Sequence, residues 1–233
     1  MPSERSFIDR IQRAEELHTA VTAISPAYAP ADARFSLAAL SAGITAAKAA
    51  NQAVDEALPP YQDEVTERAA IIKLINPLIT QSLAYVKSNT AWVKRYDAVK
   101  DLADKVRGVT PPKVKASSPE PDKKTRNRGE QSYVEIAAHL KRYIARLEGL
   151  SGYAPPDAKI SLATLTAHLT TLSELNQTLP AHAQTLADAI VDRQEAYTGA
   201  TGLKFVFAGV KTSVKGQYGQ SSLPFTSLSG MRW

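Results

Sequence analysis

A ten-residue motif occurs twice in this sequence, and the repetition constrains the fold more than any single residue does. Residues 28–37 read YAPADARFSL, and residues 153–162 read YAPPDAKISL. The match extends without gaps from residues 28–68 to residues 153–193, with 15 identities in 41 positions. Identity of this extent at one constant offset indicates a tandem duplication.

Both matching segments have the residue spacing of a long helix. From Leu37 and from Leu162 onward, seam residues recur at alternating spacings of three and four, in the same phase in both segments. This spacing is typical of a helix that packs along a seam. The sequence therefore predicts a long bundle helix in each copy.

Aspartates and prolines predict where these helices begin and bend. In each motif a proline is followed two residues later by Asp32 or Asp157, a carboxylate that suits the positive end of the helix dipole. Pro59, Pro60 and Pro180 lie inside the predicted helices, where each removes a backbone donor. We expect a kink at these prolines, with a tight break into two helices as the alternative.

Shorter helices are expected on both sides of each long helix. A stripe from Phe7 to Val21 is matched at an offset of 126 by a stripe from Tyr133 to Leu147. A following helix is predicted from Leu78 to about Val106 in the first copy, and over residues 203–218 in the second. No segment alternates with period two, so the predicted fold is all-α, a tandem duplication of a long-helix bundle repeat. The two repeats could pack into one elongated bundle.

Charge and proline content divide the chain. Residues 104–128 carry 8 basic and 3 acidic side chains, whereas residues 1–103 carry 11 and 12. We expect a first helical repeat over residues 1–107, a basic Pro/Ser-rich linker over 108–130, a second repeat over 131–218 and a C-terminal tail over 219–233. The basic linker residues are Lys113, Lys115, Lys123, Lys124, Arg126 and Arg128.

The chain resembles a group of uncharacterised bacterial proteins with two helical repeats joined by a basic linker. The resemblance rests on the Tyr-Ala-Pro-x-Asp motif with its Ser-Leu, the Asn of the long helix, the linker, and the ending from Gly202-Leu-Lys-Phe to Gly-Met-Arg-Trp233. That group usually has a more polar and basic ending than the Leu223-Pro-Phe-Thr of this chain. The resemblance implies the fold and implies no activity.

Composition excludes several classes of chemistry. The 233 residues include no Cys, which excludes disulfides, Cys-ligated zinc, iron–sulfur clusters and thiol catalysis. No Gly-x-Ser-x-Gly, phosphate-binding Gly-rich loop or His-Glu-x-x-His motif is present. Charged residues interrupt the N-terminal segment, and no long uninterrupted apolar segment suits a membrane span. We expect a cytoplasmic protein that is not an enzyme, with no cofactor and no transmembrane segment.

One pair of residues has the spacing that a di-metal site uses. Glu15 and His18 have the Glu-x-x-His spacing of carboxylate-bridged di-metal bundles, but Glu135 and His139 are four apart. His18 aligns with an apolar residue, Ile144, in the second copy. We therefore expect His18 to be a core or boundary residue and expect no metal site.

Two pairs of polar residues occupy seam positions in both copies. They are Asn51 with Asn176, and Arg68 with Arg193. A buried Asn in a seam can specify register or partner choice, and an Arg can pack its stem while its head reaches water. We expect packing specificity from these residues, with a ligand-binding polar pair as the alternative.

The last helix and the tail offer further contact surfaces. Lys204, Lys211 and Lys215 form a basic face, which suits either solvent or an anionic partner. Phe225 and Trp233 are apolar anchors in the tail that must pack on their own bundle or on a neighbouring subunit.

These features favour a non-enzymatic structural or interaction protein that self-associates as a homo-oligomer through its helical bundles. The alternative is a weak, sequence-independent nucleic-acid-binding protein, or one with another acidic partner, that uses the basic linker. The linker has no aromatic residue that could stack on bases, which weighs against the alternative.

Overall fold

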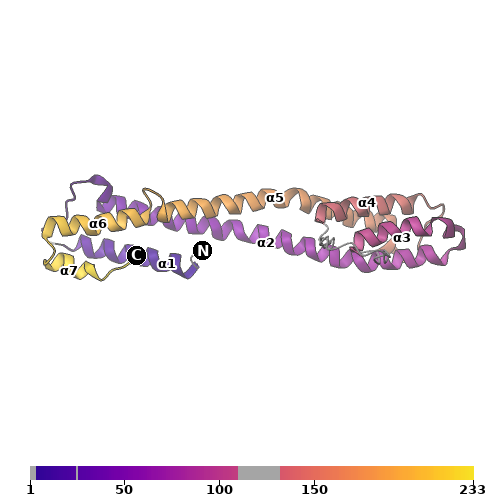
Figure 1. Ribbon diagram of the computed structural model, residues 1–233, viewed down its shortest axis with the longest axis horizontal. Coiled ribbons are helices and arrows are strands. Elements are labelled where there is room, and N and C mark those ends of the chain that lie inside the picture. Colours follow the sequence, from indigo (N-terminus) through magenta and orange to yellow (C-terminus); the bar gives the residue numbers. More distant parts are fainter. Residues whose placement is uncertain (1–3, 25, 110–131) are drawn as a thin grey trace, which may run out of the picture. The chain divides into compact units, whose positions relative to one another are not determined.

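The fold is all-α, as predicted. The computed structural model describes residues 4–24, 26–109 and 132–233, and no strand occurs among them (Figure 1). The α-helices are α1 (Glu4–Thr22), α2 (Leu37–Ser88), α3 (Val93–Arg107), α4 (Tyr133–Glu148), α5 (Leu162–Thr198), α6 (Leu203–Tyr218) and α7 (Leu223–Ser229). Three single-turn 3-10 helices precede long helices or follow them: η1 (Ala33–Phe35), η2 (Thr90–Trp92) and η3 (Ala158–Ile160).

The two copies of the motif adopt the same local structure. Asp32 and Asp157 each cap a 3-10 turn, accepting a hydrogen bond from the backbone N–H two residues on. Ser36 and Ser161 then cap the long helices, each accepting from the backbone N–H three residues on at 3.1 and 3.2 Å. The prediction that the long helices start at the aspartates is therefore wrong. They start at Leu37 and Leu162, because the extended backbone at each serine separates the 3-10 turn from the helix.

The first tyrosine of the motif closes the loop before each long helix. The hydroxyl of Tyr28 donates to the carbonyl of Phe35 at 2.9 Å, and the hydroxyl of Tyr153 donates to the carbonyl of Ile160 at 2.9 Å. Matching residues therefore make matching bonds in both segments.

The prolines lie within continuous helices. The 52 residues of α2 include Pro59 and Pro60, and the 37 residues of α5 include Pro180. A break into separate helices does not occur at these positions, because the surrounding turns keep helical backbone. In the first copy α2 also continues past Leu78 to Ser88, so the helix predicted to begin at Leu78 instead begins at Val93, after η2.

The described residues form two compact units that cross the predicted division of the chain. Unit 1 comprises Met1–Tyr61 and His182–Trp233, and unit 2 comprises Gln62–Ala181. We call residues 1–109 the N-terminal half and residues 132–233 the C-terminal half. Each unit contains helices from both halves, because α2 and α5 each contribute one end to unit 1 and the other end to unit 2. In both long helices the boundary between the two units comes within two residues after a proline: after Tyr61 in α2 and after Ala181 in α5.

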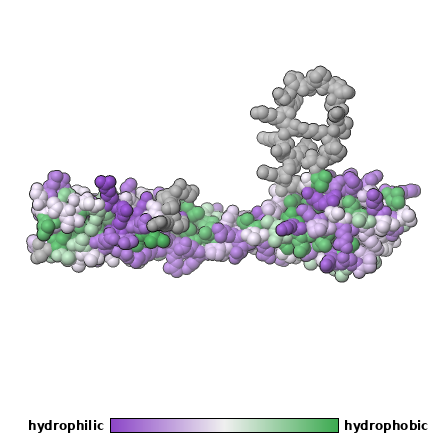
Figure 2. Space-filling model, turned by 90° about the horizontal axis from the view of Figure 1, so that it is seen from below, coloured by the Kyte–Doolittle hydropathy of each residue, from purple (hydrophilic) through white to green (hydrophobic). Residues whose placement is uncertain are grey.

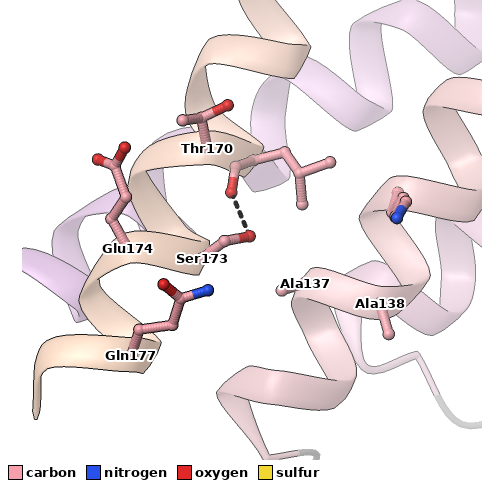
Figure 3. A pocket seen from close by; sticks show the side chains of 8 residues that line it. Ala137, Ala138, Thr170, Ser173, Glu174 and Gln177 are labelled. Carbon is pink, nitrogen blue, oxygen red and sulfur yellow. Dashed lines mark hydrogen bonds between the residues drawn. The ribbon is translucent and has the colours of Figure 1, made fainter.

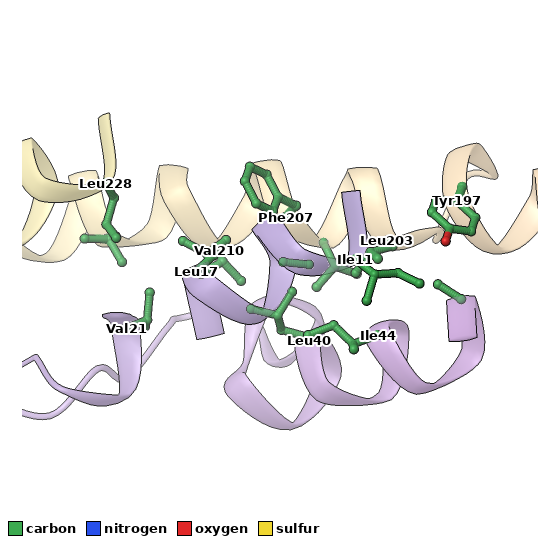
Figure 4. Close-up of a cluster of buried hydrophobic side chains, with 14 of the residues drawn as sticks. Ile11, Leu17, Val21, Leu40, Ile44, Tyr197, Leu203, Phe207, Val210 and Leu228 are labelled. Carbon is green, nitrogen blue, oxygen red and sulfur yellow. The ribbon is translucent and has the colours of Figure 1, made fainter. Parts of the chain in front are cut away.

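The core of unit 1 joins the first helices of the N-terminal half to the last helices of the C-terminal half. Leu17 of α1, Leu40 of α2, Tyr197 of α5 and Val210 of α6 have no exposed surface. Figure 4 shows these side chains, together with Leu228 of α7, in one cluster of buried side chains. Burying such a side chain stabilises the fold by about 1.5–3 kcal/mol, so the contact between halves is a main source of stability in this unit.

The core of unit 2 also comes from both halves, here from the last helices of the N-terminal half and the first helices of the C-terminal half. Ile75 and Ile79 of α2 and Val99 of α3, from the N-terminal half, pack with Leu140 of α4 and Leu165 of α5, from the C-terminal half. All five side chains are fully buried. A hydroxyl pair, Ser82 and Tyr143, lies inside this core at 2.5 Å.

The C-terminal tail packs on its own unit. It forms α7 beside α6 and α1, and Leu228 is fully buried in the unit 1 core. The Trp233 ring lies 5.5 Å from the Phe207 ring and 6.4 Å from the Tyr197 ring, between ring centres. Phe225 packs against the same core. The structure therefore places both predicted anchors on the chain's own bundle.

Candidate functional site

In unit 2 the seam residues of the two halves meet at an aromatic ring. The guanidinium carbon of Arg68 lies 4.0 Å from the centre of the Tyr133 ring. The Asn176 amide donates to the carbonyl of Tyr133 at 3.1 Å and accepts from Arg68 at 3.5 Å. Arg68 comes from α2, whereas Asn176 and Tyr133 come from α5 and α4, so the cluster is shared by both halves.

Unit 1 contains the matching cluster with the halves exchanged. The guanidinium carbon of Arg193, from α5, lies 4.3 Å from the centre of the Phe7 ring of α1. The amide of Asn51, from α2, donates to the hydroxyl of Tyr197 at 2.9 Å, and this hydroxyl donates to the carbonyl of Phe7 at 3.2 Å. Arg193 is 7% exposed and is therefore a buried cation over an aromatic face.

The two clusters differ in how the amide reaches the first helix. In unit 2 Asn176 binds the Tyr133 carbonyl directly, whereas in unit 1 the Tyr197 hydroxyl lies between Asn51 and the matching carbonyl of Phe7. Sequence reasoning placed the Asn and Arg residues in seams but missed their aromatic partners. The signal was present, because Phe7 and Tyr133 occupy matching positions in the two stripes.

These clusters favour packing over ligand binding. The amides of Asn51 and Asn176 bind groups of the same clusters, while Asn51 Oδ1 and Arg68 Nε are buried without a hydrogen-bond partner. Buried polar groups of this kind specify which partner and register a helix accepts, because a mispaired amide or guanidinium is costly. The arrangement fixes how the two halves fit.

A groove of unit 2 lies between α4 and α5 (Figure 3). It has a volume of about 500 Å³ and is open to solvent, with Ala137 and Ala138 on one side and Ser173 and Gln177 on the other. The Ser173 hydroxyl donates to the carbonyl of Leu169 at 2.7 Å, so it is engaged by its own helix. Lys141 and Glu174 also line this groove.

A groove at the matching place in unit 1 contains an ion pair. Lys48 Nζ lies 2.6 Å from a carboxylate oxygen of Glu15, and both side chains are about half exposed. Exposed pairs of this kind contribute at most about 1 kcal/mol. His18 lines the same groove. Within the described part of the chain, no group of three or more His, Cys, Asp or Glu residues could hold a metal ion.

The basic face of the last helix is used largely inside unit 1. The Lys211 ammonium donates to the carbonyls of Met231 at 2.5 Å and Ser229 at 3.4 Å, and burial lowers the pKa of Lys211. The Lys215 ammonium lies 5.8 Å from the centre of the Phe225 ring. Lys204 is exposed. Two of the three lysines therefore hold the C-terminal tail against α6.

The six basic residues of the linker, Lys113 to Arg128, lie outside the described residues. Among the helices that the structure describes, α2 is long and apolar enough to cross a membrane by length and composition. Mostly buried core helices of soluble proteins pass the same criterion; α2 supplies Leu40 and Ala47 to the unit 1 core, and 28% of its apolar window is buried. The chain matches no protein-family model, no curated protein and no solved structure.

Proposed function

We propose that this protein is a non-enzymatic structural or interaction protein that associates with itself through its helical bundles. The observation that carries the proposal is that each core is built from two apolar surfaces, one from each half of the chain. Both surfaces are present in every copy of the chain. A second copy therefore offers a partner that matches in shape and in polar pattern.

The polar clusters support an interaction role. Arg68 and Arg193 each stack on an aromatic ring of the other half, and Asn51 bonds to a side chain of the other half. These polar side chains, which a binding or catalytic site could have used, therefore make contacts between the halves. They make the contact selective for one partner and register, whereas apolar burial alone would accept several.

Exposed aliphatic side chains give the two first helices a similar outer surface. Ile8 of α1 and Val134 of α4 occupy matching positions, and each is 63% exposed. On the face shown in Figure 2, hydrophobic residues are interspersed with hydrophilic ones. The apolar patches on such an outer surface are small. We therefore expect association mainly through the larger apolar surfaces by which the two halves pack together.

Sedimentation velocity of the full chain at low and high salt tests the proposal. We expect dimers or larger oligomers whose fraction is unchanged by salt, because apolar association is not screened as charge contacts are. A variant in which the six basic linker residues are replaced by Ser should associate equally well. A chain that stays monomeric at every concentration and salt would contradict the proposal, and oligomers that form only with DNA and the intact linker would favour nucleic-acid binding.

A further inference from the structure

We infer that unit 1 binds the surface of an anionic lipid bilayer through the outer face of α7 and the groove beside it. This inference goes beyond the proposed self-association and does not depend on it. The face combines two exposed arginines with Leu223, which is more exposed than any other large hydrophobic residue in the described part of the chain.

The arginines line a groove between α1 and the segment that follows α7. The groove has a volume of about 410 Å³ and is lined by Arg13, Glu16, Ser227, Gly230, Met231 and Arg232. The guanidinium of Arg13 donates to the backbone carbonyl of Arg232 at 2.7 Å, which keeps the two arginines close together. Both residues are exposed, so a partner at the surface can reach their side chains.

Positive charge dominates around this groove. From Ala196 to Trp233 the sequence has four basic residues and no acidic residue. Arg10 of α1 adds a further cation, because its guanidinium carbon lies 5.7 Å from the centre of the Trp233 ring. The acidic member of the groove, Glu16, accepts a hydrogen bond from Gln12 at 3.1 Å. Among the described residues, none of the three arginines forms an ion pair with a carboxylate, so their charge is available to an anionic partner.

Leu223 adds an apolar contact on the same face of α7. It is 82% exposed at the first position of the helix. Ser227, which lines the groove, comes four residues later and therefore lies on the same side of the helix. Leu223 is thus about 5.4 Å along the helix axis from the groove. Cations beside an exposed aliphatic side chain suit the boundary between lipid headgroups and acyl chains.

The exposed leucine favours a bilayer over a nucleic acid. Arginine side chains bind phosphate groups of either partner, so the charge alone does not distinguish them. A nucleic-acid backbone would leave Leu223 in water, whereas the acyl boundary of a bilayer would bury it. Lipid phosphates and acyl chains together therefore complement both parts of this face.

Vesicle co-sedimentation of the full chain tests the inference. The six basic linker residues are first replaced by Ser, so that the linker does not add to binding. This protein is mixed with vesicles of phosphatidylcholine alone, or with vesicles containing about one-third phosphatidylserine. We expect binding to the anionic vesicles that weakens as salt rises, and little binding to phosphatidylcholine alone.

Substitutions on the proposed face should weaken this binding. Arg13→Gln combined with Arg232→Gln should weaken it by about twentyfold, and Arg232→Gln alone by about fivefold. The single variant covers the case in which loss of the Arg13 hydrogen bond loosens the segment after α7. Leu223→Ser should weaken binding by about threefold. The helical signal and thermal unfolding of each variant show whether it is folded.

Matched controls remove the same chemistry from unit 2. Arg142→Gln combined with Arg146→Gln removes two exposed arginines of α4, and Val134→Ser removes an aliphatic side chain that is 63% exposed. Both controls should bind anionic vesicles as the linker-substituted protein does.

Four results would overturn the inference. The first is equal binding to both kinds of vesicle, and the second is binding to neither. The third is a loss in the controls as large as in the test variants, which would show a general charge effect. The fourth is a Leu223→Ser variant that binds unchanged while duplex DNA displaces the vesicles, which would show a site for nucleic-acid phosphates. Sedimentation without vesicles measures self-association separately, so each of these results leaves the proposed function standing.

Discussion

Arg193 and Phe7, which belong to opposite ends of the sequence, form a stack in which the guanidinium carbon lies 4.3 Å from the ring centre. Arg68 and Tyr133 form the matching stack of the other unit at 4.0 Å. In each case the arginine comes from a long helix and the ring from the first helix of the other half. The two stacks therefore tie the halves together with the same chemistry in both units.

The two arginines should differ in their contribution to stability. Arg193→Ala removes a buried cation–π contact and is expected to lower the free energy of unfolding by about 2 kcal/mol. Arg68→Ala removes the half-buried counterpart and should cost about 1 kcal/mol. Chemical denaturation measures both, with the exposed Arg146→Ala as a control that stays within about 0.5 kcal/mol of wild type. A larger loss at Arg68 would contradict this ranking.

The two asparagines should respond differently to the same substitution. Asn176→Leu removes the hydrogen bond to the Tyr133 carbonyl and leaves Arg68 without its amide acceptor, so we expect a loss of about 2 kcal/mol. Asn51→Leu removes one hydrogen bond but also a buried unpaired oxygen, so its effect should stay within about 1 kcal/mol. Equal losses in thermal or chemical unfolding would argue against the assigned bonds.

Two glycines of α6 form a matched pair for testing the packing of unit 1. A Cβ at Gly209 would lie 2.0 Å from the Cδ1 of Phe35, whereas a Cβ at Gly216 would meet nothing within 4 Å. Gly209→Ala should therefore lower stability by about 1–3 kcal/mol through overpacking. Gly216→Ala should raise stability by about 0.5–1 kcal/mol through helix propensity. Opposite signs in a thermal melt are expected, and stabilisation by both would refute the close approach of Phe35.

Alkaline pH should destabilise unit 2 through Tyr143. Burial raises the pKa of Tyr143 from 10.0 to about 12, so between these values the unfolded chain ionises while the folded chain stays protonated. The stabilisation is complete below pH 10 and is lost as pH rises toward 12, by about 3 kcal/mol in total.

Tyr143→Phe is the control for this pH dependence. It loses the contact with the Ser82 hydroxyl, at a cost of about 1 kcal/mol at neutral pH, but removes the group that ionises. Its unfolding free energy should therefore fall less than that of wild type between pH 10 and 12. Parallel pH profiles for the two proteins would contradict the assignment.

Much of the fold follows from residue spacing. The alternation of three and four identified Leu40, Ala47, Leu165 and Leu172 as seam residues, and all four are fully buried. Spacing defines the buried face of a helix because side chains three and four apart lie on one side. The all-α class and the continuous helix across Pro180 follow from the same pattern.

The partner of each face could not be predicted in the same way. The two long helices share one phase, so the spacing does not distinguish packing within a half from packing between halves. Arg193 and Arg68 lie at seam positions in either case, and only the structure shows that each meets the first helix of the other half. The end of α2 also escaped prediction, because its apolar spacing runs on beyond Leu78 until Asn89 caps η2.

Cutting the linker tests most directly the claim that both halves complete each core. A chain carrying a protease recognition sequence inserted between Pro119 and Glu120 is cut, and its sedimentation and thermal unfolding are compared with those of the uncut chain. The account predicts that the two fragments sediment together as one complex, keep the helical signal and unfold in a transition that moves to higher temperature with concentration, because folding is now bimolecular. Two fragments that sediment separately while each keeps its helical signal would contradict it.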